Sequence, residues 1–293
     1  MSQCLLCTGA LGREVFPFAT CFNGQTYRYR TCKHCGTSTI DPLPGPDELA
    51  AFYRQDDYHG VFYTEQEEEA DTLLGSYLPQ EPGKPMRLLD FGCGSGQFLR
   101  QARALGFEAE GVELDPMVRQ RAAQLSGCPV HALDELKAAS LRFDVIHLGD
   151  VLEHLPTPYD SMRELEVLLE DGGRFFIEGP LETNSSLVRT AGVLFGELRS
   201  RVGRRAIGSF PPYHLFQTNA RAQRAFFEQR LGYAVDRFDV WETGWPYLST
   251  NPASAGARVR DLIGRASVIA AKAARPVARL GNRFATLVRP RRD

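Results

Sequence analysis

Four of the seven cysteines form two pairs with the spacing of metal-binding knuckles. The pairs are Cys4-x2-Cys7 and Cys32-x2-Cys35. A Cys-x2-Cys turn places two thiolates on one side of a tight loop, and two such turns complete a tetrahedral zinc shell. Because all four positions are then filled by protein, the expected zinc is structural and not catalytic. Two other residues could in principle replace a thiolate, namely Cys21 and His34.

A second chemical feature is a glycine-rich turn that follows an apolar segment. Residues 86–91 have the pattern of a buried strand, and residues 92–96 read Gly-Cys-Gly-Ser-Gly. Such a turn lets a ligand approach backbone amides at the start of a helix. Glu113 stands 17 residues after Gly96, at the expected end of the next strand. A carboxylate there can accept both hydroxyls of a ribose, although an ordinary surface acid is the alternative.

The elements that position these residues alternate between strand and helix patterns. Strands are expected at residues 86–91, 129–133, 143–148 and 174–178, together with a strand that ends at residues 111–113. Helices are expected at residues 97–105 and 116–125. This alternation predicts an α/β fold with an open parallel sheet. Ligands of such sheets bind at the carboxyl ends of the strands.

Five segments, in order, resemble the motifs of class I S-adenosylmethionine (SAM)-dependent methyltransferases. They are residues 88–96, 111–116, 143–146, 150–155 and 169–173. The resemblance implies a Rossmann-like, seven-stranded, mostly parallel sheet, in which residues 233–240 form a late antiparallel strand. With a small N-terminal zinc ribbon, the chain is similar to bacterial methyltransferases of sugars and secondary metabolites and to proteins of polysaccharide gene clusters.

The resemblance also implies which residues hold SAM. Asp90 would orient its amino group, Glu113 would hold the ribose hydroxyls, and Leu114 would lie against adenine. Asp134 is the candidate for a further adenine contact. The full implied set is Asp90, Gly92, Cys93, Gly94, Gly96, Glu113, Leu114 and Asp134.

Two histidines are candidates for a catalytic base. SAM supplies the reactivity in methyl transfer, so the protein positions the acceptor and manages one proton. His154 lies in one of the motifs above, where a structural, hydrogen-bonded histidine is the alternative. His214 lies in the sequence Pro-Pro-Tyr-His-Leu-Phe. In the related enzymes a His-x-Phe sequence here borders the acceptor pocket, and the alternative for His214 is a packing role.

Two segments combine cations with apolar residues. Residues 181–212 form a candidate amphipathic lid, whose arginines could meet a phosphate on the acceptor or could be a solvated helix face. These arginines are Arg189, Arg199, Arg201, Arg204 and Arg205. In residues 251–293, cations recur every seven residues at Arg258, Arg265, Lys272 and Arg279. This spacing predicts an amphipathic helix, with Pro276 as the candidate position for a kink. The helix could contact an anionic membrane, the body of the protein or a second subunit.

The basic and acidic residues are also distributed unevenly, with a change at the start of the tail, near residue 251. Residues 251–293 hold ten basic and two acidic residues, and the remaining 250 residues carry a net charge of −10. An acidic body disfavours a broad nucleic-acid surface. No segment approaches the ~18 apolar residues of a membrane span. The N-terminus lacks the pattern of a secretory signal, so we expect a cytoplasmic protein in which disulfides are disfavoured. If the tail binds lipid, the protein would be peripheral at the inner membrane surface.

We therefore predict four segments and one leading function. The segments are a zinc ribbon (1–41), a helical linker (42–85), a SAM-binding methyltransferase domain (86–250) and a basic amphipathic tail (251–293). The predicted function is methyl transfer from SAM to a small hydroxylated acceptor, such as a sugar, nucleotide-sugar or secondary metabolite. The alternatives are an RNA base methyltransferase and a catalytically silent SAM-binding module.

Overall fold

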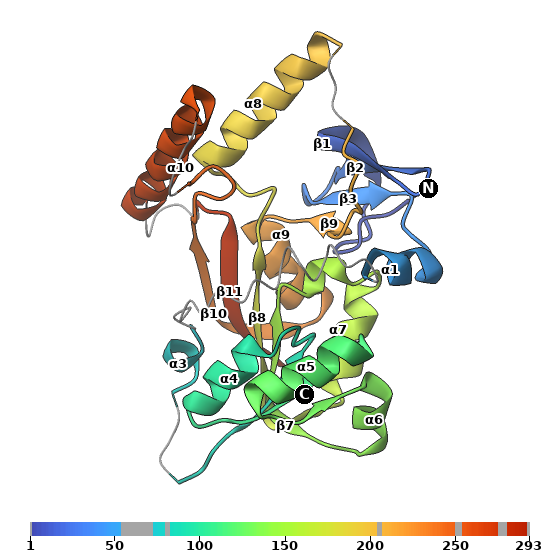
Figure 1. The fold of residues 1–293 in the computed structure, drawn as a ribbon, viewed down its shortest axis with the longest axis vertical. Helices are drawn as coiled ribbons and strands as arrows, with labels where there is room; N and C mark the ends of the chain where they lie inside the picture. The colour runs from blue at the N-terminus through green and yellow to red at the C-terminus, as the bar shows by residue number, and fades with distance from the viewer. Residues whose placement is uncertain are drawn as a thin grey trace.

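The computed structural model describes residues 2–53, 73–79, 83–203, 207–249, 254–274 and 280–291. Two sheets organise them (Figure 1). A seven-stranded sheet has the order β10-β11-β8-β7-β4-β5-β6, and a four-stranded sheet has the order β1-β2-β3-β9. The predicted α/β fold with a mostly parallel seven-stranded sheet is confirmed.

The strands of the larger sheet run mostly in one direction. They are β4 (Arg87–Phe91), β5 (Glu108–Val112), β6 (Val130–His131), β7 (Phe143–Gly149), β8 (Leu169–Pro180), β10 (Tyr233–Trp241) and β11 (Arg283–Pro290). Pairing is parallel from β6 through β5, β4 and β7 to β8. Strand β11 is antiparallel to both β8 and β10. Among the described strands of this sheet, β11 is therefore the one that runs against the others.

This arrangement corrects the expected direction of residues 233–240. They form a strand, β10, but it runs parallel to β8 because β11 lies between the two. The antiparallel strand comes from the tail, where a helix was expected. Residues of β11 are buried on both of its sides, with Phe284 and Val288 in one core cluster and Ala285 and Leu287 in the other. Alternation of apolar residues across a sheet explains why this segment is a strand.

Helices cover both faces of the larger sheet. Leu88 of β4 packs in one cluster with Leu99 of α4 (Gln97–Ala104), together with residues of α3 (Leu74–Tyr77) and α5 (Pro116–Ser126). The next residue, Leu89, packs on the opposite side with Met162 of α7 (Pro158–Glu166) and residues of α6 (Leu133–Ala138) and α9 (Ala220–Ala225). The doubly covered sheet leaves its strand ends as the place for a ligand site.

The N-terminal ribbon is joined to this domain through shared sheet pairing. Its strands are β1 (Leu11–Phe22), β2 (Gln25–Cys32) and β3 (Ser38–Asp41), and β9 (Phe216–Gln217) is added from the larger domain. A separate core cluster includes the ribbon strands themselves, where Tyr27 of β2 and Ile40 of β3 pack with Phe52 of α1 (Pro46–Tyr53) and with Leu215.

The expected linker, lid and tail are only partly described. Within 42–85, α1 and α3 are helical, and residues 54–72 and 80–82 lie outside the described residues. The expected lid contains α8 (Leu187–Arg201), and the tail contains α10 (Ala255–Ala274) before β11. Arg204, Arg205, Pro276 and Arg279 lie outside the described residues. In the described parts of the chain, no helix combines the length and hydropathy that crossing a bilayer requires.

Candidate active site

The four predicted zinc ligands lie together in the ribbon. The Sγ atoms of Cys4, Cys7, Cys32 and Cys35 all lie within 4.8 Å of one another. Cys4 Sγ is 3.6 Å from Cys35 Sγ, and Cys7 Sγ is 3.4 Å from Cys32 Sγ. Zn–S bonds of about 2.3 Å in a tetrahedron separate the sulfurs by about 3.8 Å. The thiolate cluster therefore fits a structural zinc, and neither Cys21 nor His34 belongs to it.

The glycine-rich turn connects β4 to α4 in a backbone conformation that requires glycine. Gly92 and Gly96 have φ angles of 77° and 79°. A Cβ atom at Gly96 would lie 2.8 Å from the carbonyl oxygen of Ala122, and one at Gly92 would lie 2.8 Å from a methyl group of Val151. The close approach of neighbouring elements thus explains these glycines, while the turn leaves backbone amides at the start of α4.

Glu113 lies beside this turn, as predicted. Its Oε2 accepts a hydrogen bond from the Gly94 N–H at 3.1 Å. Its Oε1 accepts from the N–H groups of Leu114 and Asp115, at 2.8 Å and 3.1 Å. These donors fix the carboxylate at the end of β5, where it faces the same turn that would hold the rest of SAM.

The other residues expected to contact SAM differ in their exposure to solvent. Leu114 is 77% exposed next to Glu113, so its side chain is available to a ligand. Cys93 is buried against Gly111, so it could contact SAM only through its backbone. Asp134 is exposed in the first turn of α6, directly after β6. It is thus at the same edge of the sheet as Glu113.

Asp90 is buried at the end of β4 and is paired with a histidine. Its Oδ1 lies 2.7 Å from His147 Nδ1, and its Oδ2 is buried without a hydrogen-bond partner among the described residues. His147 lies between Phe98 and Phe176, and its Nε2 is 3.4 Å from Glu178. Burial lowers the pKa of His147, but the two carboxylates outweigh it and raise the pKa to about 9. The unpaired Asp90 oxygen fits the ammonium group of SAM.

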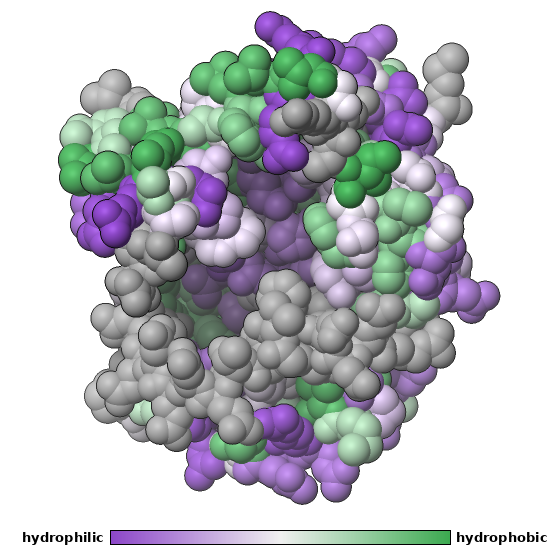
Figure 2. Space-filling view, turned by 45° about the horizontal axis from the view of Figure 1, so that its top comes forward, coloured by the Kyte–Doolittle hydropathy of each residue, from purple (hydrophilic) through white to green (hydrophobic). Residues whose placement is uncertain are grey.

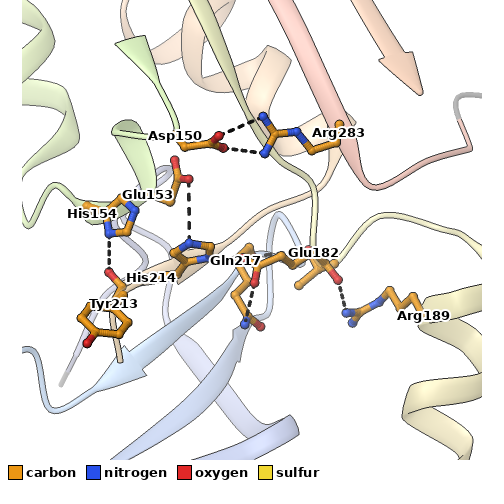
Figure 3. A network of polar contacts seen from close by, with 10 residues as sticks. Asp150, Glu153, His154, Glu182, Arg189, Tyr213, His214, Gln217 and Arg283 are labelled. Carbon is orange, nitrogen blue, oxygen red and sulfur yellow. Dashed lines mark hydrogen bonds and ion pairs between the residues drawn. The ribbon is translucent and has the colours of Figure 1, made fainter. Parts of the chain in front are cut away.

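Both predicted catalytic histidines lie at the neighbouring strand ends (Figure 3). His154 is in a 3₁₀ turn, Leu152–His154, after β7, and His214 precedes β9. The two rings are 4.9 Å apart and nearly perpendicular. His154 Nδ1 is 2.8 Å from the Tyr213 carbonyl oxygen. A carbonyl oxygen only accepts, so Nδ1 carries the proton and Nε2 carries the lone pair.

His214 is held by a glutamate that follows β8. Its Nδ1 lies 3.0 Å from Glu182 Oε2, and its Nε2 lies 3.9 Å from Glu153 Oε1. Gln217 Nε2 donates to the other Glu182 oxygen at 3.2 Å, and Arg189 donates to the Glu182 backbone carbonyl. The Glu182 carboxylate is thus oriented by contacts other than the one with the His214 imidazole.

The electrostatics of the two histidines are opposite. Burial, together with the nearby charge of His214, lowers the pKa of His154 to about 3, so His154 stays neutral at physiological pH. Burial also lowers the pKa of His214, but carboxylates led by Glu182 raise it to about 9. Burial raises the pKa of Glu153, which therefore leaves Glu182 as the main partner of the His214 cation. The site pairs a neutral imidazole with one that readily holds a proton.

The ribbon takes part in positioning His214. The Leu215 N–H donates to the Glu153 carbonyl at 2.8 Å, and the Leu215 carbonyl accepts from the Ile40 N–H of β3 at 3.0 Å. The next residues pair with β3 as strand β9. Figure 2 shows a hollow with a hydrophilic floor on the face that it presents, and in Figure 1 β9 lies next to β3 of the ribbon. The chain next to His214 is therefore fixed from both domains.

A model of a family described as a methyltransferase domain matches residues 63–226. The chain belongs to this methyltransferase family. A ubiquinone biosynthesis O-methyltransferase of Cereibacter sphaeroides is 34% identical over 112 residues, which cover 36% of this chain and 44% of that protein. Methyltransferase str2 of Strobilurus tenacellus is 29% identical over 110 residues, which cover 36% and 40%. The matched segments thus span less than half the length of these two relatives.

Solved structures with similar backbones include two archaeal proteins. A SAM-dependent methyltransferase from Archaeoglobus fulgidus has a TM-score of 0.45 and 18% identity, covering 73% of this chain and 90% of that one. The PH0226 protein from Pyrococcus horikoshii OT3 has a TM-score of 0.48 and 15% identity, covering 81% and 100%.

Sequence reasoning missed several polar residues of this candidate site. Glu182 and Glu153 flank His214, and Asp150 forms a two-bond pair with Arg283 at 2.6 Å and 3.0 Å. Glu182 could have been found, because it follows the fifth strand at the carboxyl edge of the sheet. Arg283 could not, because it required knowing that the tail enters the sheet beside β8.

A second group of residues of metal-ligand type also occurs in this candidate site. Glu153, His154 and His214 each present one ligand atom within 4.8 Å of the others. Imidazole binds metals only through an unprotonated nitrogen. A cation could therefore bind here only in place of the proton on His214 Nε2.

Proposed function

We propose that this methyltransferase transfers the methyl group of SAM to a hydroxyl group of a small acceptor, such as a sugar, nucleotide-sugar or secondary metabolite. SAM would bind at the turn and Glu113, and it supplies a methyl group on a positively charged sulfur. The observation that carries the proposal is the His214–Glu182 pair, 3.0 Å apart, at the adjacent strand ends. Glu182 follows β8 at the same edge of the sheet as the glycine-rich turn, which supports His214 as a base for an acceptor bound near the cofactor.

In the proposed reaction His214 is the general base. Glu182 accepts from Nδ1–H, which leaves Nε2 on the side of Glu153 and His154. In its unprotonated form, which becomes more populated as the pH rises toward the pKa of about 9, His214 would take the acceptor hydroxyl proton on Nε2. The oxygen–methyl bond would form as the sulfur–methyl bond of SAM breaks and its electron pair returns to sulfur, and Glu182 would stabilise the histidine cation. The proposed role of Glu182 is that of the carboxylate in a catalytic triad, which orients the histidine base and stabilises its cation.

His154 stays neutral beside His214, so it adds no positive charge to this part of the site. A phosphate on the acceptor has less support. Arg189 already donates to the Glu182 carbonyl, and Arg283 is paired through both terminal nitrogens with Asp150.

The test uses SAM with an isotopically labelled methyl group, the purified protein and an extract of the source cells. Untargeted mass spectrometry should find a small hydroxylated molecule that gains the labelled methyl group. The variant His214→Gln should bind SAM with unchanged affinity but form product at least about 100-fold more slowly. Glu164→Gln, which changes an exposed glutamate paired with Lys137, is the matched control.

Each alternative result has a distinct meaning. Tight SAM binding without any labelled product would favour the silent SAM-binding module. Label in the RNA fraction would favour the RNA methyltransferase. Labelled product at an unchanged rate with His214→Gln would keep the enzyme but remove His214 as its base.

A further inference from the structure

Exposed apolar side chains gather on the helix pair α8 and α10. Eight of the eighteen large hydrophobic residues that are exposed in the described chain lie on these helices or directly after α8. They are Leu187, Leu194, Phe195, Leu198, Val202, Val259, Leu262 and Ile269. The helices are joined where the Leu187 N–H donates to Ser267 Oγ at 3.2 Å, and they lie side by side in Figure 1. A patch of this kind marks an interaction surface.

Helix α10 packs on the body with its small and polar residues. Its buried residues are Asp261, Gly264, Ser267 and Ala271. Asp261 accepts from the Ser249 N–H at 3.0 Å, and Ser267 Oγ donates to buried Glu242 at 3.1 Å. At about 100° per residue, Leu262 and Ile269 fall on the side opposite to this buried face. Val259, Leu262 and Ile269 therefore face outward, whereas Ile263 and Val268 of the same helix are half-buried.

Helix α8 shows the same inversion against the ribbon. Gly192 and Gly196 face the ring of Phe16 in β1, so closely that a Cβ at Gly196 would lie 2.5 Å from it. Leu194 and Leu198 lie on the other side of the helix and are more than 60% exposed. Val188 near the start of α8 is its buried apolar residue, and the part of the helix that faces Phe16 carries glycines, so burial in this protein does not account for Leu194 and Leu198.

Cations border this apolar surface. Arg258, Arg265 and Lys272 are exposed and recur every seven residues, so they form a row beside the apolar stripe of α10. Arg199 and Arg201 are exposed at the end of α8. The two helices together hold seven basic and two acidic residues, in a chain whose net charge is −2. An apolar stripe bordered by cations is typical of helices that lie in a lipid interface.

We propose that α8 and α10 dock on a membrane surface that contains anionic lipids. The apolar side chains would enter the boundary between headgroups and acyl chains, and the cations would meet the headgroups. A second copy of the chain is a poorer occupant. A two-fold contact places the same patch on both sides, so these cations would face one another. This docking does not depend on the identity of the methyl acceptor.

The test measures flotation of the full-length protein with lipid vesicles. One set contains phosphatidylcholine, and the other also contains phosphatidylglycerol. Wild type should float with the anionic vesicles, and added salt should weaken this binding. The combined variant L194Q/L198Q/L262Q/I269Q should reduce binding at least about tenfold. L125Q/V167Q, at two exposed apolar positions elsewhere, is the matched control and should bind like wild type.

The charge row is tested by R258Q/R265Q/K272Q, which should remove the preference for anionic vesicles. Deletion of residues 251–293 is unsuitable, because it would also remove β11 from the sheet. A thermal shift with SAM checks that each variant is folded, and Leu262→Gln alone serves if the combined variant is not.

Two results would overturn the proposal. The first is that wild type does not float with anionic vesicles, or floats no better than the apolar variant. The second is a dimer in analytical ultracentrifugation that the apolar variant makes monomeric, without vesicle binding by wild type. That second result would identify a second copy as the occupant.

Discussion

The pairing of Glu182 with His214 predicts a measurable change in the pKa of the histidine. The change to test is Glu182→Gln, which keeps the size of the side chain and removes its charge. Gln217 and Arg189 hold residue 182 from other directions, so the local backbone should be retained. We expect the pKa of His214 to fall from about 9 toward the ordinary value of 6.5.

The size of the change follows from the 3.0 Å contact between His214 Nδ1 and Glu182 Oε2. A hydrogen bond between charged groups contributes about 1.5–3 kcal/mol, and one pKa unit corresponds to about 1.4 kcal/mol. Removing the charge should therefore lower the pKa of His214 by about one to two units. Glu153 lies farther from the ring, at 3.9 Å, so its variant should have a smaller effect.

The assay is NMR titration of the histidine Cε1–H signals between pH 5 and about pH 10, which needs no methyl acceptor. The chain has six histidines, and His214→Gln identifies the signal of His214. Wild type should titrate near pH 9, and Glu182→Gln should titrate clearly lower. A wild-type pKa near 6.5, or an unchanged pKa in Glu182→Gln, would refute the assignment of Glu182 as the orienting carboxylate.

Three further changes test the ribbon, the turn and the core. Cys35→Ser should lower bound zinc, measured by elemental analysis, and should lower the melting temperature, because the zinc cluster supplies folding energy to a small ribbon. Gly96→Ala should destabilise the protein by at least about 1–2 kcal/mol in urea unfolding, because φ is 79° and the new methyl group meets the Ala122 carbonyl. His147 has a raised folded pKa of about 9 against 6.5, so its contribution to stability is complete below pH 6.5 and is lost as the pH rises toward 9. The urea midpoint of wild type should fall across that range, and it should fall less in His147→Gln.

Sequence reasoning found the elements whose local pattern decides their structure. Residues 86–91 and 143–148 became strands β4 and β7, because short runs rich in apolar residues are buried in a parallel sheet that is covered on both faces. The cysteine pairs came together because the Cys-x2-Cys geometry is local and only two knuckles had to meet. The turn and Glu113 met because the ends of adjacent parallel strands share one edge.

The direction of β10 and the strand conformation of residues 283–290 depend on strand pairing, which local sequence patterns do not encode. The segment 283–290 is eight residues long and follows a helix, so its apolar residues suit either a helix or a strand. Its partners, β8 and β10, are distant in sequence. The same distance hid the contact of Arg283 with Asp150 and the contact of Ile40 with Leu215.

The tail helix shows why periodicity alone gives an incomplete answer. A seven-residue repeat of cations beside apolar residues establishes two faces but does not say which one meets the body. The usual expectation places the apolar face inward. In α10 the buried positions include Gly264, Ser267 and Ala271, and at Gly264 the neighbouring backbone leaves no space for a larger group, since a Cβ there would lie 3.0 Å from the Leu248 backbone nitrogen. Close packing therefore turns the apolar stripe outward, and the outward stripe is what makes a lipid surface the partner to test.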